Sequence, residues 1–143
     1  FFEAGFGFEE QGSYLLHPLE AAYLHKIGKT VFAKGALLDF VSLQKKRDRA
    51  FPFAFAVYLR IRTTGRLVRP YMKKTNFFRV YAPGVGREDS RPSQLVCLLP
   101  GRAPSPKSLE AQIKVAHLAR LELIIACGTE KEIKFYKVSV FNF

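Results

Sequence analysis

The first half of the chain carries apolar residues at helical spacing. Pro18 and Gly28 bound one such segment, because proline at the first helical position lacks only an N–H that would be unpaired in any case and glycine readily ends a helix. Apolar residues recur three and four positions apart in two further segments. The pattern therefore predicts helices at residues 17–28, 37–49 and 52–65, and a brief strand at residues 30–33.

The second half follows strand spacing instead. Short runs of aliphatic, β-branched and aromatic residues alternate with polar or glycine-containing turns. Residues 121–127 are almost continuously apolar, which is typical of a strand covered on both faces, so we expect this strand centrally in the sheet. One amphipathic helix is predicted from about Ser108, which can act as its N-cap, to Arg120. The predicted strands span residues 67–71, 77–81, 94–99, 121–127 and 133–141.

This order of elements predicts a mixed α/β (α+β) fold. With 143 residues, of which 48% are hydrophobic, the chain can bury one good core or two small ones. The third helix stands between the helical first half and the strand-rich second half, so we interpret it as the joint between two domains. The predicted domains are a small N-terminal α/β domain, residues 1–64, and a C-terminal mixed-sheet domain, residues 65–143.

Positive charge is concentrated in the middle of the chain. The formal net charge is +11, and residues 45–79 contain eleven Lys and Arg residues against one acid, Asp48. Such a segment suits a phosphate backbone, because each neutralised phosphate releases counterions. We therefore predict contact with nucleic acid. A solvated face on a heat-adapted protein and a surface for an acidic protein partner are the alternatives.

Composition also bears on location and assembly. No run of 18 apolar residues occurs, so we expect no membrane-spanning helix and no membrane partner. Cys97 and Cys127 lie within apolar runs, where cysteine packs as a small hydrophobe, and the sequence leaves open whether they form a disulfide. Two cysteines are too few for a disulfide-rich secreted protein, so we predict a cytoplasmic protein. The 14 Phe and 6 Tyr favour a subunit interface. Because the first residue is Phe, we expect residues before it in the natural chain.

Motifs for cofactor or metal chemistry are weak. The Gly84-Val85-Gly86 sequence lacks the third glycine and the following helix of a dinucleotide-binding loop, so we interpret it as a turn. No Ser or Cys nucleophile has a supporting signature. We expect neither a cofactor nor a bound metal. The histidines lack metal-ligand spacing and are interpreted as packing or surface residues; they are His17, His25 and His117.

One short motif keeps a metal-dependent nuclease open as an alternative. Glu132-Ile133-Lys134 has the Glu-x-Lys form found on a strand of many such enzymes, and Asp89 would be the upstream carboxylate. Charged and apolar residues that alternate at the start of a strand produce the same pattern by chance. A free-standing RNA-binding module is a second alternative, favoured by the basic middle segment.

Several blocks of the sequence resemble the archaeal tRNA-splicing endonuclease family. Residues 55–81, FAVYLRIRTTGRLVRPYMKKTNFFRVY, are similar to a helix that ends in a Tyr-x-x-x-Arg-x-x-Gly turn, a strand, and a Phe-Arg-hydrophobic-Tyr strand. Residues 16–29, LHPLEAAYLHKIGK, resemble the N-terminal helix of the family, and residues 113–127, IKVAHLARLELIIAC, resemble the helix and central strand of its C-terminal domain. The resemblance covers most of the chain from about Tyr14 onward. It implies a restriction-endonuclease-like C-terminal domain.

What the resemblance implies is cleavage of precursor tRNA at intron boundaries, without a metal, by attack of a ribose 2′-hydroxyl on the adjacent phosphorus. The family uses Tyr, His and Lys as base, acid and cation. Tyr81 matches the tyrosine, but Arg91 stands where the histidine opens a His-Ser-x-Tyr-Leu-Val strand, and Leu121 stands where the lysine follows an arginine. The resemblance therefore implies a non-catalytic, structural (beta) subunit of a heteromeric endonuclease with two structural and two catalytic subunits.

The resemblance also implies contacts with RNA and with the catalytic subunit. Lys114 stands where the family holds RNA with a helix arginine. Together with the basic segment, this gives as predicted RNA-binding residues Lys73, Lys74, Arg79, Arg91 and Lys114. The family pairs subunits through its C-terminal strand, here residues 137–143, and docks an acidic loop, here residues 128–132, in a basic cleft of the opposing dimer; a plain charged turn is the alternative. The predicted interface residues are Glu130, Glu132, Val138, Val140, Phe141 and Phe143.

Overall fold

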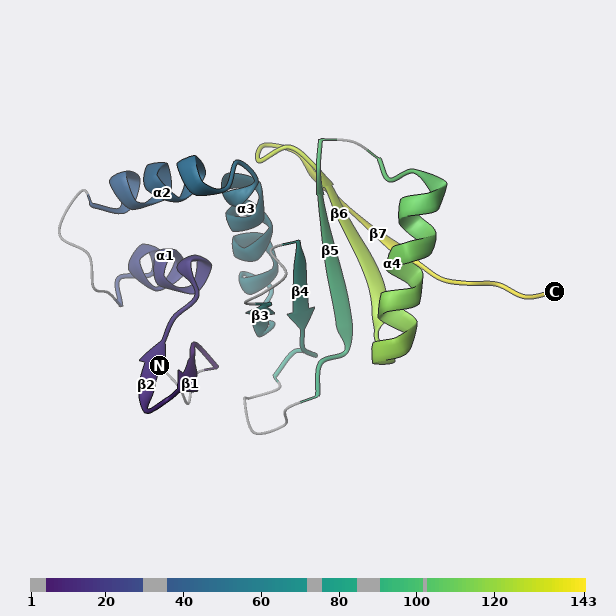
Figure 1. Ribbon diagram of the computed structural model, residues 1–143, viewed down its shortest axis with the longest axis horizontal. Coiled ribbons are helices and arrows are strands. Elements are labelled where there is room, and N and C mark those ends of the chain that lie inside the picture. Colours follow the sequence, from purple (N-terminus) through teal and green to yellow (C-terminus); the bar gives the residue numbers. More distant parts are fainter. Residues whose placement is uncertain (1–4, 30–35, 72–75, 85–90, 102) are drawn as a thin grey trace.

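The computed structural model describes residues 5–29, 36–71, 76–84, 91–101 and 103–143. The mixed α/β class predicted from the sequence is confirmed (Figure 1). The elements along the chain are β1 (Phe8–Glu10), β2 (Ser13–Leu15), α1 (Pro18–Lys26), α2 (Ala36–Arg47), α3 (Phe51–Arg62), β3 (Val68–Pro70), β4 (Phe77–Val80), β5 (Gln94–Pro100), α4 (Pro106–Ala119), β6 (Glu122–Gly128) and β7 (Ile133–Val138).

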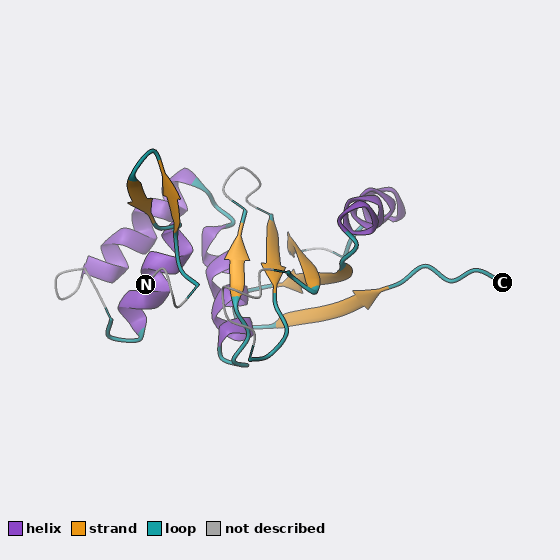
Figure 2. Ribbon diagram, turned by 90° about the horizontal axis from the view of Figure 1, so that it is seen from below, coloured by secondary structure: helices purple, strands orange, loops and turns teal. Residues whose placement is uncertain are grey.

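The main sheet has five strands in the order β3-β4-β5-β6-β7. All neighbouring pairs are antiparallel except β5 and β6, which run parallel because α4 carries the chain back to the same end of the sheet. A separate antiparallel hairpin, β1–β2, lies beside the N-terminal helices (Figure 2). The helices α3 and α4 lie on opposite sides of the sheet (Figure 1).

Two apolar cores lie on the two faces of the sheet, because side chains alternate along each strand. The first core lies between α3 and the sheet, and the second lies under α4. Ile124 and Ala126 of β6 belong to the first core, while Leu123, Ile125 and Cys127 belong to the second. The strand predicted at residues 121–127 is therefore covered on both faces as expected, and it is paired on both sides, by β5 and β7.

The predicted start of α4 and the predicted end of the last strand are wrong. The helix α4 begins at Pro106 instead of Ser108, because the Ser105 side chain is its N-cap and accepts a hydrogen bond from the Ser108 N–H at 3.1 Å. The last strand ends at Val138 instead of residue 141. Val138 is already paired with Leu123, next to the first residue of β6, so residues 139–143 have no strand left to pair with. They extend away from the sheet (Figure 1).

Other sequence expectations concern the chain ends and the domain division. The β1–β2 hairpin was not among the predicted strands, and the strand predicted at residues 30–33 lies outside the described residues. The helix α3 contacts α1, α2 and β3, and the first core contains residues from both sides of residue 64. The domain boundary at residue 64 therefore stays a prediction.

Cys97 and Cys127 are both buried and free, and burial raises the pKa of Cys97 to about 11. Within the described ranges no helix is both long and apolar enough to cross a lipid bilayer.

Candidate functional site

The three positions that the resemblance assigns to catalysis meet at one end of the five-stranded sheet. Tyr81 directly follows β4, Arg91 lies shortly before β5, and Leu121 directly precedes β6. The strand β4 runs antiparallel to β5 while β6 runs parallel to it, so the end of β4 coincides with the starts of β5 and β6. We call this region, with Tyr81, Arg91 and Leu121, the sheet end.

Tyr81, Arg91 and Leu121 do not by themselves make an acid–base set. Tyr81 is buried, and its N–H donates to the Leu67 carbonyl at 3.0 Å, which extends the β3–β4 pairing. The Leu121 N–H donates to the Ala116 carbonyl at 3.0 Å, and the Leu121 side chain packs against the second core. Arg91 is exposed, and a guanidinium does not exchange a proton near neutral pH. Leu121 thus serves the packing of α4 onto the sheet instead of presenting a charge.

A series of polar side chains crosses the strands at the same end. The Arg66 guanidinium donates to the side-chain oxygen of Gln94 at 3.5 Å, and the Gln94 amide donates to the Glu122 carboxylate at 3.3 Å. The Lys137 ammonium donates to the other oxygen of Glu122 at 2.8 Å. The bond from Lys137, followed by the bond from Gln94, lowers the pKa of Glu122. These bonds join the side chains of β5, β6 and β7.

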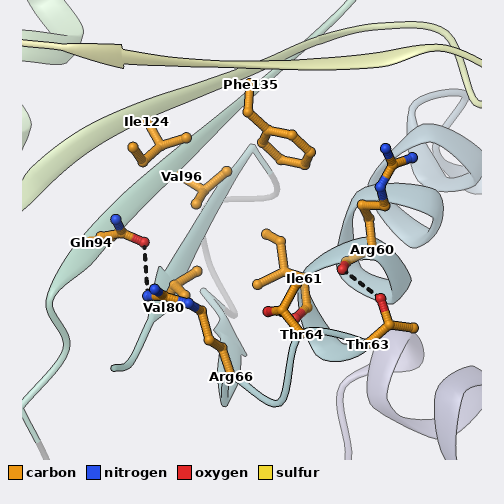
Figure 3. A pocket seen from close by; sticks show the side chains of 10 residues that line it. All are labelled: Arg60, Ile61, Thr63, Thr64, Arg66, Val80, Gln94, Val96, Ile124 and Phe135. Carbon is orange, nitrogen blue, oxygen red and sulfur yellow. Dashed lines mark hydrogen bonds between the residues drawn. The ribbon is translucent and has the colours of Figure 1, made fainter. Parts of the chain in front are cut away.

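A cavity of about 370 Å³ lies between the end of α3 and the sheet (Figure 3). Val80, Val96 and Ile124 line it from β4, β5 and β6. Arg60 of α3 and Arg66, which follows α3, bring positive charge to it, and no Asp or Glu of the described residues lines it. We call it the helix–sheet cavity. An apolar wall flanked by two cations suits an acidic segment that also carries an apolar side chain.

A larger cavity, of about 860 Å³, lies between α4, the sheet and residues 139–142. Lys114 and His117 line it from α4. Nearby apolar side chains reach far into solvent: Leu118 is 85% exposed and Phe141 is 75% exposed. The strand β7 is the last of the sheet, so one of its backbone edges has no strand beside it among the described residues. We call β7, residues 139–143 and this cavity the C-terminal surface.

A third cavity, of about 370 Å³, lies between the β1–β2 hairpin, the start of α1 and the β3–β4 pair. Arg69 and Arg79 stand opposite each other in the β3–β4 register, and both line it. The central carbon of the Arg79 guanidinium lies 4.8 Å from the centre of the Tyr71 ring, within cation–π range. Arg69 donates to the Gly7 carbonyl at 2.9 Å. We call this space the hairpin cavity.

A buried carboxylate, Glu20, which sequence reasoning missed, lines the hairpin cavity from α1. It is 2% exposed, and one of its oxygens accepts hydrogen bonds from the N–H groups of Gly7 and His17, each at 3.0 Å. Burial raises the pKa of Glu20, while these two hydrogen bonds act in the opposite direction. The signal was present in the sequence, because an N-cap residue followed three positions later by Glu has capping-box spacing.

His17, the N-cap of α1, is neutral near pH 7. Desolvation lowers its pKa to about 4, and its Nδ1 accepts a hydrogen bond from the Leu19 N–H at 3.2 Å. The interpretation of His17 as a packing residue is thus consistent with its role at the helix terminus. Its ring adds no positive charge to the hairpin cavity.

The predicted RNA-binding residues do not gather at one place. Arg79 lines the hairpin cavity, Lys114 lines the cavity of the C-terminal surface, and Arg91 is exposed at the sheet end. Lys73 and Lys74 lie outside the described residues. RNA binding at these residues stays a prediction, and it concerns three separate locations.

The predicted docking loop is a tight turn between β6 and β7. Thr129 and Glu132 exchange backbone hydrogen bonds of 3.0 and 3.1 Å, and Glu130 is exposed between them. The Glu132 carboxylate lies 3.7 Å from the Lys134 ammonium, so the Glu-x-Lys motif forms an exposed ion pair. Asp89 lies outside the described residues. Among those described, no three His, Cys, Asp or Glu side chains gather as a metal site requires.

Comparison with known proteins extends to almost the whole chain. No family model matches the sequence. The tRNA-splicing endonuclease of Thermococcus gammatolerans is 32% identical over 144 aligned positions, which cover 96% of this chain and 84% of that protein. This chain belongs to the tRNA-splicing endonuclease family. The tRNA-splicing endonucleases of Thermococcus kodakarensis and Pyrococcus furiosus are 32% and 31% identical to it, and the alignments cover 84% and 80% of their lengths.

The family resemblance inferred from separate sequence blocks is therefore confirmed. It also reaches further than expected, because alignments that cover 96% of the chain include residues before Tyr14. In this tRNA-splicing endonuclease family member, the sheet end carries a buried phenol, an exposed guanidinium and an aliphatic side chain.

Proposed function

We propose that this chain is the structural, non-catalytic subunit of a heteromeric tRNA-splicing endonuclease, in which two such chains and two catalytic subunits remove introns from precursor tRNA. The packing of Leu121 against the second core carries the proposal. The position where the family's lysine would stand belongs here to the apolar contact between α4 and the sheet. A side chain in that role supplies neither charge nor a hydrogen bond to RNA.

The reaction requires three kinds of group in one place. The ribose 2′-oxygen loses its proton and bonds to the neighbouring phosphorus, while the bond from phosphorus to the 5′-oxygen breaks and that oxygen takes up a proton. A cation stabilises the charge that grows on the phosphate oxygens. Tyr81 offers one hydroxyl, but neither Arg91 nor Leu121 can exchange the second proton. We assign these steps to the partner's active site.

The C-terminal surface supports the proposed contact with the catalytic subunit. The strand β7 presents an open backbone edge, which another strand can pair with, and the residues after it carry exposed apolar side chains. Val140 is 66% exposed, and the Phe141 and Phe143 rings pack edge-to-face with ring centres 4.9 Å apart. Aromatic groups of this kind are costly to leave in water and are enriched at subunit interfaces.

Charge complementarity supports a second contact between dimers. Glu130 and Glu132 lie exposed on a short, hydrogen-bonded turn, which holds the two carboxylates at the tip of the β6–β7 hairpin. In the proposed assembly this turn docks into a basic cleft of the opposing dimer. The helix–sheet cavity, with Arg60 and Arg66, is the corresponding receptor on this chain for an acidic loop of the partner.

The proposal is tested by cleavage of precursor tRNA with three samples: the purified chain, the catalytic subunit that co-purifies with it from the native source, and the two together. We expect no cleavage by the chain alone, with or without Mg²⁺, and cleavage by the mixture. Cleavage by the chain alone in EDTA would show a complete active site, and cleavage that requires Mg²⁺ would favour the metal-dependent nuclease. Absence of any co-purifying subunit would also contradict the proposal.

A further inference from the structure

We propose that the hairpin cavity binds one nucleotide of single-stranded RNA, with its phosphate at Arg79 and Arg69 and its base against the aromatic wall formed by Tyr71 and Phe8. The inference deepens the proposed function and rests on it for the identity of the nucleic acid. The cavity lies on the β3–β4 edge, away from the C-terminal surface, so RNA bound there would not compete with the catalytic subunit.

The positive charges around the hairpin cavity favour an anion as its ligand. Arg69 and Arg79 are direct partners in the β3–β4 register, and like charges placed directly opposite destabilise a sheet. Glu20, the carboxylate of the cavity, is already hydrogen-bonded to two backbone N–H groups and acts electrostatically on Arg69. No salt bridge links Arg79 to a carboxylate of the described residues. A phosphate between the two guanidinium groups would offset their repulsion.

Arg79 also has an unused hydrogen-bonding atom. Its Nε is covered from solvent and has no hydrogen-bond partner among the described residues. A buried donor without a partner destabilises the fold, because burial removes its hydrogen bond to water and no protein group replaces that bond. The guanidinium fork matches two phosphate oxygens, so an anion that enters the cavity can satisfy this side chain after a small rotation.

The walls suit a base next to the phosphate. The Arg79 guanidinium stacks over Tyr71, and Tyr71 is held edge-to-face by Phe77, with ring centres 6.4 Å apart. Phe8 lines the cavity from the hairpin side. Bases stack on aromatic side chains with little sequence preference. The volume of about 370 Å³ is at the small end of ligand pockets, so it admits a single nucleotide and excludes a duplex.

The cavity is fixed in shape before any ligand enters. Gly7 donates its N–H to Glu20 and accepts a hydrogen bond from Arg69 through its carbonyl, which ties the hairpin to α1 and to β3 at once. Gly7 has φ of +68°, and a side chain there would collide with Tyr14, so the position requires glycine. A pre-formed cavity binds more tightly, because less ordering accompanies binding.

The cavity is also close to the sheet end. Arg79 and Tyr81 are alternate residues on one strand, so their side chains leave the same face of the sheet and their Cα atoms are about 7 Å apart. This is close to the spacing of successive phosphates along a single strand. RNA that passes the sheet end can therefore place a neighbouring nucleotide in the hairpin cavity.

The test measures binding of a fluorescein-labelled ten-nucleotide single-stranded RNA to the full chain by anisotropy. Arg79→Gln removes the phosphate contact, and Arg49→Gln is the matched control, because it removes one exposed charge of the same basic segment. We expect about a tenfold loss of affinity for Arg79→Gln, a salt dependence reduced by about one ion, and less than a twofold change for the control. Thermal unfolding checks that both variants are folded.

A second measurement tests the base. Tyr71→Leu keeps apolar volume beside Phe77 but removes the stacking ring, and we expect about a tenfold loss of affinity, with crosslinks from 4-thiouridine RNA to the Tyr71 peptide in the unaltered chain. Equal effects of Arg79→Gln and Arg49→Gln, equal affinity for a duplex, or crosslinks elsewhere would overturn the inference. Failure here would leave the co-purification and cleavage results untouched, so the two proposals can fail separately.

Discussion

The sheet end and the C-terminal surface lie side by side on the same fold. They differ in how strictly the identity of each residue is fixed by the role proposed for the region. At the sheet end, the proposed loss of catalysis depends on particular side chains, because an arginine and a leucine stand at two of the three positions that the family resemblance assigns to acid–base chemistry. At the C-terminal surface, association requires only an open strand edge and exposed apolar groups, and both are present. On the proposed function, a subunit can lose the first property and keep the second, although the two regions adjoin at Leu121, which also lines the cavity of the C-terminal surface.

The largest effect should come from removal of the C-terminal surface. Deletion of residues 139–143 removes Val140, Phe141 and Phe143, which lie beyond the last strand, so the sheet itself should survive. We expect loss of the complex with the catalytic subunit, measured by light scattering on mixed samples. Leu38→Ser, which removes an apolar side chain 76% exposed on α2, is the control. A full-size complex from the deletion variant would place the interface elsewhere.

The packing of Leu121 at the sheet end also predicts an effect on the stability of the fold. Leu121→Lys introduces the residue that the family resemblance assigns to this position but removes an apolar contact with the second core, so we expect the free energy of unfolding to fall by about 1–2 kcal/mol. Leu118→Lys, which lies three positions earlier at the end of α4 and is 85% exposed, should change it by less than about 0.5 kcal/mol. Urea denaturation of both variants gives the difference. Equal values would mean that Leu121 has no packing role at the sheet end.

Neutralisation of the acidic turn should give a smaller and salt-dependent effect. Glu130→Gln with Glu132→Gln should leave the pair of one structural and one catalytic subunit intact while the larger assembly dissociates several-fold more readily at low salt. This difference should shrink at high salt, where the charge contact of the unaltered chain is itself screened. Glu110→Gln, an exposed acid on α4, is the matched control. Sedimentation at two salt concentrations separates the species. If the double variant assembles like the control, the turn is only a charged hairpin.

The smallest effect is expected at Tyr81. Tyr81→Phe keeps the ring in its buried place and removes only the hydroxyl, and neither Arg91 nor Leu121, the other two positions of the sheet end, can act with it as a proton donor. We expect the cleavage rate of the assembled enzyme to change by less than about twofold. A loss of about a hundredfold, the usual scale for an acid–base group, would show that this chain contributes to an active site.

Regular periodicity explains why most elements could be predicted. The helices at residues 18–26, 36–47 and 51–62 and the longer strands of the main sheet, β5, β6 and β7, each repeat an apolar pattern over enough residues to be recognised. The β1–β2 hairpin has strands of three residues, too short for a pattern. Its turn depends on left-handed Gln11 and Gly12, and the Tyr14 hydroxyl donates to the Phe6 carbonyl. Such contacts are set by the folded hairpin.

The candidate functional residues also divide into those that the sequence could point to and those that it could not. Tyr81, Arg91 and Leu121 were assigned from sequence motifs by family resemblance, and the order of strands brings the three positions to one end of the sheet; their catalytic assignment stays a prediction. Glu20 could not be identified as buried, because a carboxylate on a short helix is ordinarily exposed. Its burial depends on the Gly7 N–H, thirteen positions away, and on the hairpin that covers it. The hairpin cavity was hidden from the sequence for the same reason.

The hydrogen bond between Gly7 and Arg69 joins residues 62 positions apart, and this separation bears on the order of folding. The hairpin and the buried Glu20 complete their environment only when β3 is in place, which follows the synthesis of all three N-terminal helices. Contacts between residues so far apart in the sequence form slowly, because the chain must lose the entropy of closing a long loop before these contacts stabilise the fold. On the ribosome residues 7–15, although synthesised before α1, α2 and α3, should therefore be among the last of the described residues to become protected from hydrogen exchange.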